Sequence, residues 1–129
     1  VSLDNALFLL KDEINSLDIN LNVTGDNLLS LNIVFDEIKH IFSKLIAKSI
    51  ENFKSDELEE KKEININFEN KDESIYIIYS DNATTSNKNQ NEDFDLGFYL
   101  VKVFVEKNFG LLNVEKTQDG IKYIIRFDK

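Results

Sequence analysis

A long helical repeat between residues 28 and 53 restricts the fold of this chain more than any other feature. Side chains at helical spacing fall on one stripe, and all but one of them are apolar: Leu31, Phe35, Ile38, Phe42, Leu45, Ser49 and Phe53. Such a stripe is the buried face of an amphipathic helix. A helix buries its apolar face only against another layer of structure. The rest of the chain must therefore supply a sheet or further helices to cover this stripe.

Other segments alternate between apolar and polar residues, which is the period of a half-buried strand. The predicted strands are residues 19–24, ended by Gly25, and the pair 64–68 and 74–80, which the polar segment 69–73 joins as a hairpin. A last hairpin within residues 111–127 turns at Asp119-Gly120 and places on one face Ile121, Tyr123, Ile125 and Phe127. The chain therefore supplies the sheet that the long helix requires.

Two further helical patterns complete the order of elements. Residues 3–17 form one of them. The other is residues 96–109, with Asn108 and Gly110 as its predicted C-terminal stop. Its predicted buried residues are Leu96, Leu100, Val103 and Phe104. Residues 82–93 are polar without periodicity, which predicts a loop. This order predicts an α+β fold, a two-layer α/β sandwich in which three helices cover one face of a mixed sheet.

The composition excludes several classes of function. The chain has 129 residues, which fits a single domain, and 24 acidic against 15 basic residues leave a net charge of −9. This balance argues against nucleic acid and against an anionic membrane as the main partner. There is no cysteine, and no apolar run is long enough to span a membrane. We therefore expect a cytoplasmic domain, residues 1–129, that is cut from a longer protein because it starts at Val1.

Several short motifs stand in a recognisable register. In residues 96–127, "LGFYLVKVFVEKNFGLLNVEKTQDGIKYIIRF", the matching positions are Leu96, Gly97, Leu100, Val101, Lys102, Gly110 and Gly120. Together with the order of elements, they resemble the ATP-binding domain of sensor histidine kinases, which shares the Bergerat fold with gyrase and MutL. "IYIIYSDNA" resembles the strand with that family's Asp-x-Gly box, and "FSKLIAKSIENF" resembles the helix with its asparagine box. The resemblance covers nearly the whole chain.

This resemblance assigns a role to Asp81, which ends the strand 74–80. The family's strand-end aspartate accepts a hydrogen bond from the adenine amino group, and an ionised carboxylate suits such a donor. The alternative is an ordinary turn, because aspartate bonds to its own backbone and ends strands well. If nucleotide binding is retained, the resemblance also implies contacts from Leu96, Gly97 and Lys102.

The sequence departs from the family pattern where the phosphates and their metal would lie. Lys44 and Lys48 stand where the family has two asparagines, and a lysine has no acceptor with which to ligate Mg²⁺. Ala83 replaces the glycine of the Asp-x-Gly box, and Asp93 and Asp95 replace glycines before the last helix. At ~5 Å and a dielectric of ~20, each such acid repels a phosphate charge by roughly 3 kcal/mol.

We therefore expect a degenerate nucleotide site, with no catalytic residue, no metal and no cofactor. Metal-free ATP binding stays open, with Lys44 and Lys48 as counter-charges to phosphate, and so does a salt bridge from Lys48 to Asp81 or Asp95. The expected function is a signalling or scaffold module in a two-component or phosphotransfer pathway. Its expected partners are proteins, either a receiver domain or a helical dimerisation hairpin. A kinase domain that still binds ATP and an anti-sigma regulator are the alternatives, and His40 is expected on the surface.

Overall fold

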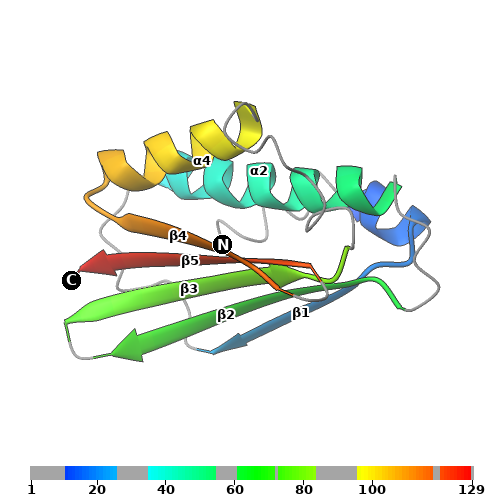
Figure 1. The fold of residues 1–129 in the computed structure, drawn as a ribbon, viewed down its shortest axis with the longest axis horizontal. Coiled ribbons are helices and arrows are strands. Elements are labelled where there is room, and N and C mark those ends of the chain that lie inside the picture. Colours follow the sequence, from blue (N-terminus) through cyan, green and yellow to red (C-terminus); the bar gives the residue numbers. More distant parts are fainter. Residues whose placement is uncertain are drawn as a thin grey trace.

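The computed structural model describes residues 11–25, 35–54, 61–71, 73–83, 96–117 and 120–128. These residues form two layers, with a sheet on one side and helices packed against one of its faces (Figure 1). The predicted α+β sandwich is therefore confirmed. The predicted helix 3–17 is helical over residues 11–16, and its earlier residues lie outside the described ranges.

The sheet has five strands in the order β1-β2-β3-β5-β4. They are β1 (Asn20–Gly25), β2 (Glu63–Lys71), β3 (Ser74–Asp81), β4 (Leu111–Lys116) and β5 (Ile121–Asp128). β1 pairs with β2 in parallel, and every other pair is antiparallel, so the sheet is mixed as predicted. The turn between β2 and β3 is shorter than the predicted segment 69–73, because residues 69–71 continue the ladder with residues 74–76.

The core lies between the sheet and the helices. In β3 the buried positions alternate with half-buried ones, so Ile75, Ile77, Tyr79 and Asp81 all face the helices. β5 buries its predicted face in the same way, with Ile121, Tyr123, Ile125 and Phe127 inside. Across this core lies α2 (Phe35–Lys54), whose predicted stripe is buried at Phe42, Leu45, Ser49 and Phe53. The helix 28–53 is thus confirmed over its described part.

The last helix, α4 (Leu96–Lys107), packs beside α2. It ends two residues before residue 109, the predicted last residue of this helix. Its buried side chains are Val101 and Val105, whereas Val103, which was predicted inside, is 39% exposed. The prediction was wrong for Val103 alone among the described positions, since Leu100 and Phe104 are half-buried and Phe104 packs against the core. Within the described residues, no helix has both the length and the apolar character needed to cross a membrane.

The turn after α4 also differs from the prediction. The residue with a left-handed backbone is Phe109, with φ of 62°, and not the predicted stop Gly110. Gly110 is needed for a different reason, since a Cβ atom there would lie 2.6 Å from the ring of Phe127. The helix therefore ends in a conformation that favours glycine, at a position occupied by phenylalanine.

Candidate functional site

The candidate site is centred on Asp81, the last residue of β3. Strand alternation turns its side chain toward the helices, where only 7% of the residue remains exposed. Its Oδ1 accepts a hydrogen bond from the backbone N–H of Ala83 at 3.1 Å, which is the turn-forming bond expected of an ordinary aspartate. The burial, however, exceeds what a turn requires, and Oδ2 takes a second donor from across the core.

That donor is Ser49 on α2, whose Oγ lies 2.6 Å from Asp81 Oδ2. The same Oγ lies 2.7 Å from the hydroxyl of Tyr79, which also donates to the carbonyl of Leu45 at 3.1 Å. Because each hydroxyl has one hydrogen, a serine that donates to Asp81 can only accept from Tyr79, whose single hydrogen is then shared between Ser49 Oγ and the Leu45 carbonyl oxygen. The three side chains form a buried hydrogen-bonded chain that ends on the carboxylate and links β3 to α2.

This chain changes the acidity of Tyr79. Burial raises the pKa of the Tyr79 phenol well above its usual value of about 10, and the nearby charge of Asp81 raises that pKa further. The side-chain hydrogen bond between Ser49 and Tyr79 acts in the opposite direction but does not cancel these effects. Tyr79 therefore keeps its proton and can act as a donor throughout the neutral range.

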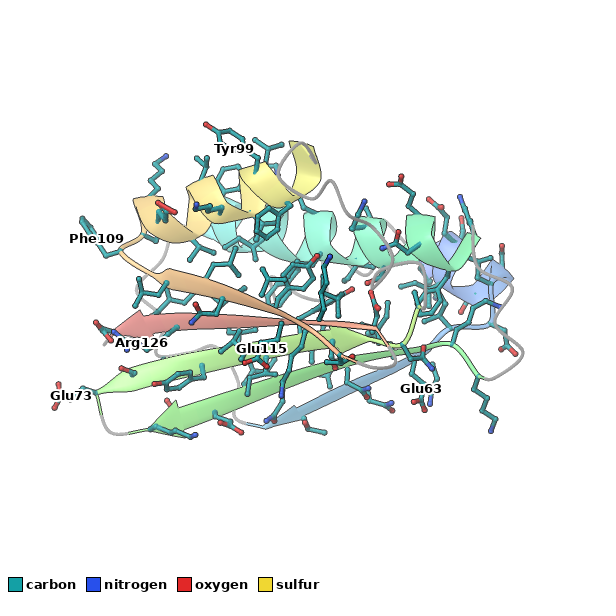
Figure 2. The ribbon with its side chains drawn as sticks, in the orientation of Figure 1. Glu63, Glu73, Tyr99, Phe109, Glu115 and Arg126 are labelled. Carbon is teal, nitrogen blue, oxygen red and sulfur yellow. The ribbon has the colours of Figure 1, made fainter. Side chains whose placement is uncertain are left out.

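The backbone around Asp81 is fixed by neighbouring strands. Asn82 closes the end of the ladder, because its side chain accepts from the N–H of Glu63 at 2.8 Å and donates to the carbonyl of Lys61 at 2.7 Å. Figure 2 shows Glu63 at this end of the sheet. A Cβ atom on Gly120 would lie 2.1 Å from the Asp81 carbonyl oxygen, so only glycine fits there. The carboxylate is thus carried on a rigid support.

Ala83 stands where the resembled family has a glycine, and the structure buries it completely. It belongs to the same continuous core as Tyr79 and Ile121. The extra methyl group is therefore buried in the core, on a residue whose backbone N–H bonds to Asp81 Oδ1.

Lys44 and Lys48 lie on α2 immediately before Leu45 and Ser49, the two residues that bond to the Tyr79 hydroxyl. Both lysines are half-buried and lie one helical turn apart. An ammonium group donates hydrogen bonds and cannot ligate a hard cation. The two lysines therefore do not fit Mg²⁺, whereas they do offer positive charge on this stretch of α2. A salt bridge from Lys48 to Asp81 or Asp95 stays a prediction.

The other predicted site residues lie on α4. Leu96 and Gly97 are its first two residues, and Asp93 and Asp95 before them are outside the described ranges. Lys102 is exposed and lies 3.9 Å from Glu106, one turn along the same helix. The structure therefore joins Asp81 to α2 through Ser49, the residue after Lys48, while Lys102 faces solvent. His40 is exposed, as predicted, and its ring stacks on Phe104 with 5.3 Å between centroids.

Two residues of the site, Ser49 and Tyr79, were not predicted as functional. Ser49 was assigned to the buried stripe of the long helix, and Tyr79 to the interior of a strand. The available signal was a single hydroxyl on an otherwise apolar stripe, because a buried hydroxyl needs a hydrogen-bond partner. The sequence does not say that the partner is Asp81, since that contact depends on how α2 lies across β3.

Comparison with known proteins places this geometry in a familiar fold. No protein-family model matches the sequence, and no curated protein matches it either. Among solved structures, the catalytic domain of the histidine kinase ThkA, in a nucleotide-free form, superposes with a TM-score of 0.77 at 16% identity, over 99% of this chain and 90% of that one. The Acinetobacter baumannii histidine kinase AdeS gives a TM-score of 0.78 at 12% identity, over 98% of this chain and 62% of that one.

A third structure holds the histidine kinase ThkA in complex with the response regulator protein TrrA. This chain superposes on it with a TM-score of 0.72 at 18% identity, over 99% of its own length and 39% of that chain. At these identities the likeness shows the fold, and it extends over almost the whole chain. The protein thus has the fold of a histidine kinase catalytic domain, as its sequence motifs predicted.

Proposed function

We propose that this chain is a histidine-kinase-type ATP-binding domain whose nucleotide site has degenerated, and that it acts as a signalling or scaffold module in a two-component or phosphotransfer pathway. One observation carries the proposal. Lys44 and Lys48 lie one turn apart on α2, and Lys48 directly precedes Ser49, which bonds to Asp81; at these two positions the resembled family has the asparagines that serve magnesium-dependent transfer. Ala83 supports it, because a buried alanine, whose N–H bonds to Asp81, replaces the glycine of the family's Asp-x-Gly box.

In this role the module works through protein partners, either a receiver domain or a helical dimerisation hairpin. The ThkA complex with a response regulator supports that class of partner, because the ThkA chain in it shares this fold. The acidic balance of the chain, with a net charge of −9, disfavours nucleic acid. The proposed location is the cytoplasm.

A second function is favoured by the state of Asp81. Its carboxylate is buried and oriented by Ser49 and Ala83, as recognition of an amino group on a base would require. A carboxylate offers about four acceptor sites, so these two bonds do not by themselves exhaust it. On this alternative the domain binds ATP, with Lys44 and Lys48 as charges on the phosphates, and supports histidine phosphorylation.

Titration with ATP and a non-hydrolysable analogue separates these functions, by calorimetry and by thermal shift, with and without Mg²⁺. The proposed function predicts no stabilisation that depends on Mg²⁺. Stabilisation by nucleotide alone, lost in Asp81→Asn but kept in Lys102→Ala, would assign a metal-free nucleotide site. Stabilisation that requires Mg²⁺ would overturn the proposal in favour of the kinase.

A further inference from the structure

The hydroxyl of Ser49 makes its bonds outside the helix that carries it. A serine in the middle of a helix either faces solvent or turns its hydroxyl back to the carbonyl four residues earlier, which for Ser49 is that of Leu45. Ser49 is only 1% exposed, so solvent is not available to it. Its Oγ instead reaches across the core to Asp81 Oδ2 at 2.6 Å and to the Tyr79 hydroxyl at 2.7 Å.

This hydroxyl therefore has two discrete arrangements. A buried hydroxyl needs a hydrogen-bond partner, and the two acceptors open to Ser49 are the Leu45 carbonyl in its own helix and the Asp81 carboxylate on β3. The bond to the carboxylate is charge-assisted and so is the stronger of the two. The bond to Leu45 would hold Ser49 within α2 and would withdraw its hydrogen from Asp81.

Tyr79 blocks the arrangement inside the helix. A carbonyl oxygen can accept two hydrogen bonds, and helical geometry assigns one of those at Leu45 to the backbone N–H of Ser49. The Tyr79 hydroxyl donates to the same oxygen at 3.1 Å and so uses its second position. A Ser49 hydroxyl that turned back would have to displace Tyr79. The phenol, which is fully buried, thus favours the arrangement that reaches Asp81.

The ring of Tyr79 is in turn held by aromatic contacts that lead to α4. Tyr123, its direct partner in the ladder between β3 and β5, has its ring centroid 6.0 Å away. The ring of Phe98 lies 6.2 Å from that of Tyr123, and both separations are within the usual range for packed aromatic pairs. Phe98 belongs to the first turn of α4. A movement of this turn would therefore reach Tyr79 through two ring contacts.

The rest of α4 does not share this connection in the same way. Phe104, which is half-buried like Phe98, stacks on His40 of α2 with 5.3 Å between centroids. The two phenylalanines thus bury similar rings from the same helix but contact different partners. They form a natural pair of positions with which to separate a specific connection from general packing.

We propose that Tyr79 is a positioning residue for Asp81. By occupying the Leu45 carbonyl it directs the Ser49 hydroxyl to the carboxylate, and its ring contacts make this setting depend on the first turn of α4. A ligand or partner that moves this turn changes the donor at Asp81, and a donor bound at Asp81 acts back on α4, because such coupling is reciprocal. The device belongs to the free domain, so it does not rest on nucleotide binding.

Nuclear magnetic resonance of the ¹³C-labelled chain without nucleotide tests the role of the hydroxyl. In Tyr79→Phe, which keeps the ring, the three-bond couplings that report χ1 of Ser49 are expected to move toward an average of two rotamers. The carboxyl resonance of Asp81 is expected to shift by more than its linewidth. Tyr76→Phe is the matched control, because it removes a hydroxyl from the opposite face of β3, and it should leave both signals unchanged.

Phe98→Leu tests the connection to α4. It is expected to shift the Asp81 resonance in the same direction as Tyr79→Phe, because the ring that supports Tyr123 is lost. Phe98→Tyr keeps that ring and is expected to retain the resonance position of the unmodified chain. Phe104→Leu is the control and should leave the Asp81 resonance in place, since its ring contacts α2 instead.

Three results would overturn the proposal. The first is a Ser49 side chain that keeps its couplings in Tyr79→Phe, which would mean that the phenol does not direct it. The second is an Asp81 resonance that does not move in Phe98→Leu. The third is a shift in Phe104→Leu as large as that in Phe98→Leu, which would assign the effect to general packing of α4. None of these results bears on the titrations with ATP, so the two proposals fail separately.

Discussion

At one end of the sheet Ser49, Tyr79 and Asp81 bury their polar groups against one another, whereas at the other end Phe109 and Leu111 expose apolar side chains to solvent. The register places these ends at opposite tips of the same strands, because Asp81 pairs with Ile121 and Leu111 pairs with Arg126. The first end is held by contacts inside the molecule. At the second end the side chains of Phe109 and Leu111 contribute little to the core, although the backbone of the turn is hydrogen-bonded to α4.

The largest effect is expected from Gly120→Ala, at the Asp81 end. The new methyl group would meet the Asp81 carbonyl oxygen at 2.1 Å and the Asn82 Cα atom at 3.0 Å, and a backbone cannot turn away as a side chain can. We expect a loss of about 3 kcal/mol in the free energy of unfolding, measured by urea denaturation. Gly110→Ala is the comparison at the other end, where the obstacles are side chains of Phe127 and Val105. An equal or larger loss of stability in Gly110→Ala would mean that side-chain obstacles are no easier to move than the backbone at Gly120.

Ser49→Ala is expected to have the next largest effect. It removes the donor to Asp81 Oδ2 and leaves a buried carboxylate oxygen without that bond, which costs about 2 kcal/mol in the free energy of unfolding. Ser43→Ala, at a half-buried position of the same helix, is the control and should change stability by less than about 0.5 kcal/mol. If the two variants unfold at the same urea concentration, the buried hydrogen bonds among Ser49, Tyr79 and Asp81 contribute nothing to stability.

Tyr79→Phe tests the same buried hydrogen bonds through the pH dependence of stability. At about pH 8 the lost hydrogen bonds are expected to cost about 1 kcal/mol. Because the pKa of Tyr79 is raised on folding, its unfolded form releases a proton above about pH 10 while the folded form keeps it. The unfolded state then binds fewer protons, so this part of the stability is present below about pH 10 and is lost as the pH rises further.

The unmodified chain should therefore lose more stability than Tyr79→Phe between about pH 9 and about pH 11, as followed by urea midpoints at each pH. Parallel pH profiles for the two chains would show that Tyr79 ionises with equal ease in both states.

Phe109→Gly is expected to change stability about as little as Tyr79→Phe does, but in the opposite direction. Glycine adopts the left-handed turn without the steric cost that phenylalanine bears, so we expect a gain of about 1 kcal/mol in the free energy of unfolding. Tyr99→Ala should stay within about 0.5 kcal/mol of the unmodified chain. A loss of stability in Phe109→Gly would mean that the ring makes a contact that stabilises the fold, and the two ends would then differ less than they seem.

The same contrast separates what the sequence predicts from what it leaves open. Periodicity predicts the strands and helices, because burial on one face imposes a fixed spacing: the strand 74–80 and the stripe of α2 followed from it, whereas Asp81 was singled out by the family resemblance. The contact between Ser49 and Asp81 joins residues 32 positions apart, and it depends on how α2 lies across the sheet.

The other end shows a second reason for failure. A glycine near the end of a helix predicts a left-handed stop, and the sequence offered Gly110, but the turn uses Phe109 while Gly110 serves close packing against Phe127. Local pattern alone does not distinguish these two uses of glycine. Nor does it tell which strand becomes an edge, since β4 precedes β5 in the chain but lies outside it in the sheet.

That inversion of order has a consequence for biosynthesis. β5 is the latest described strand in the sequence and yet lies between β3 and β4, so the growing chain cannot complete its sheet until β5 has been made. Until then β4 lacks the one described strand with which it pairs, and its leucines can bind a chaperone that recognises apolar extended segments. Translation that stops before residue 121 would therefore leave a polypeptide without a closed core, and such fragments should be degraded rather than accumulate.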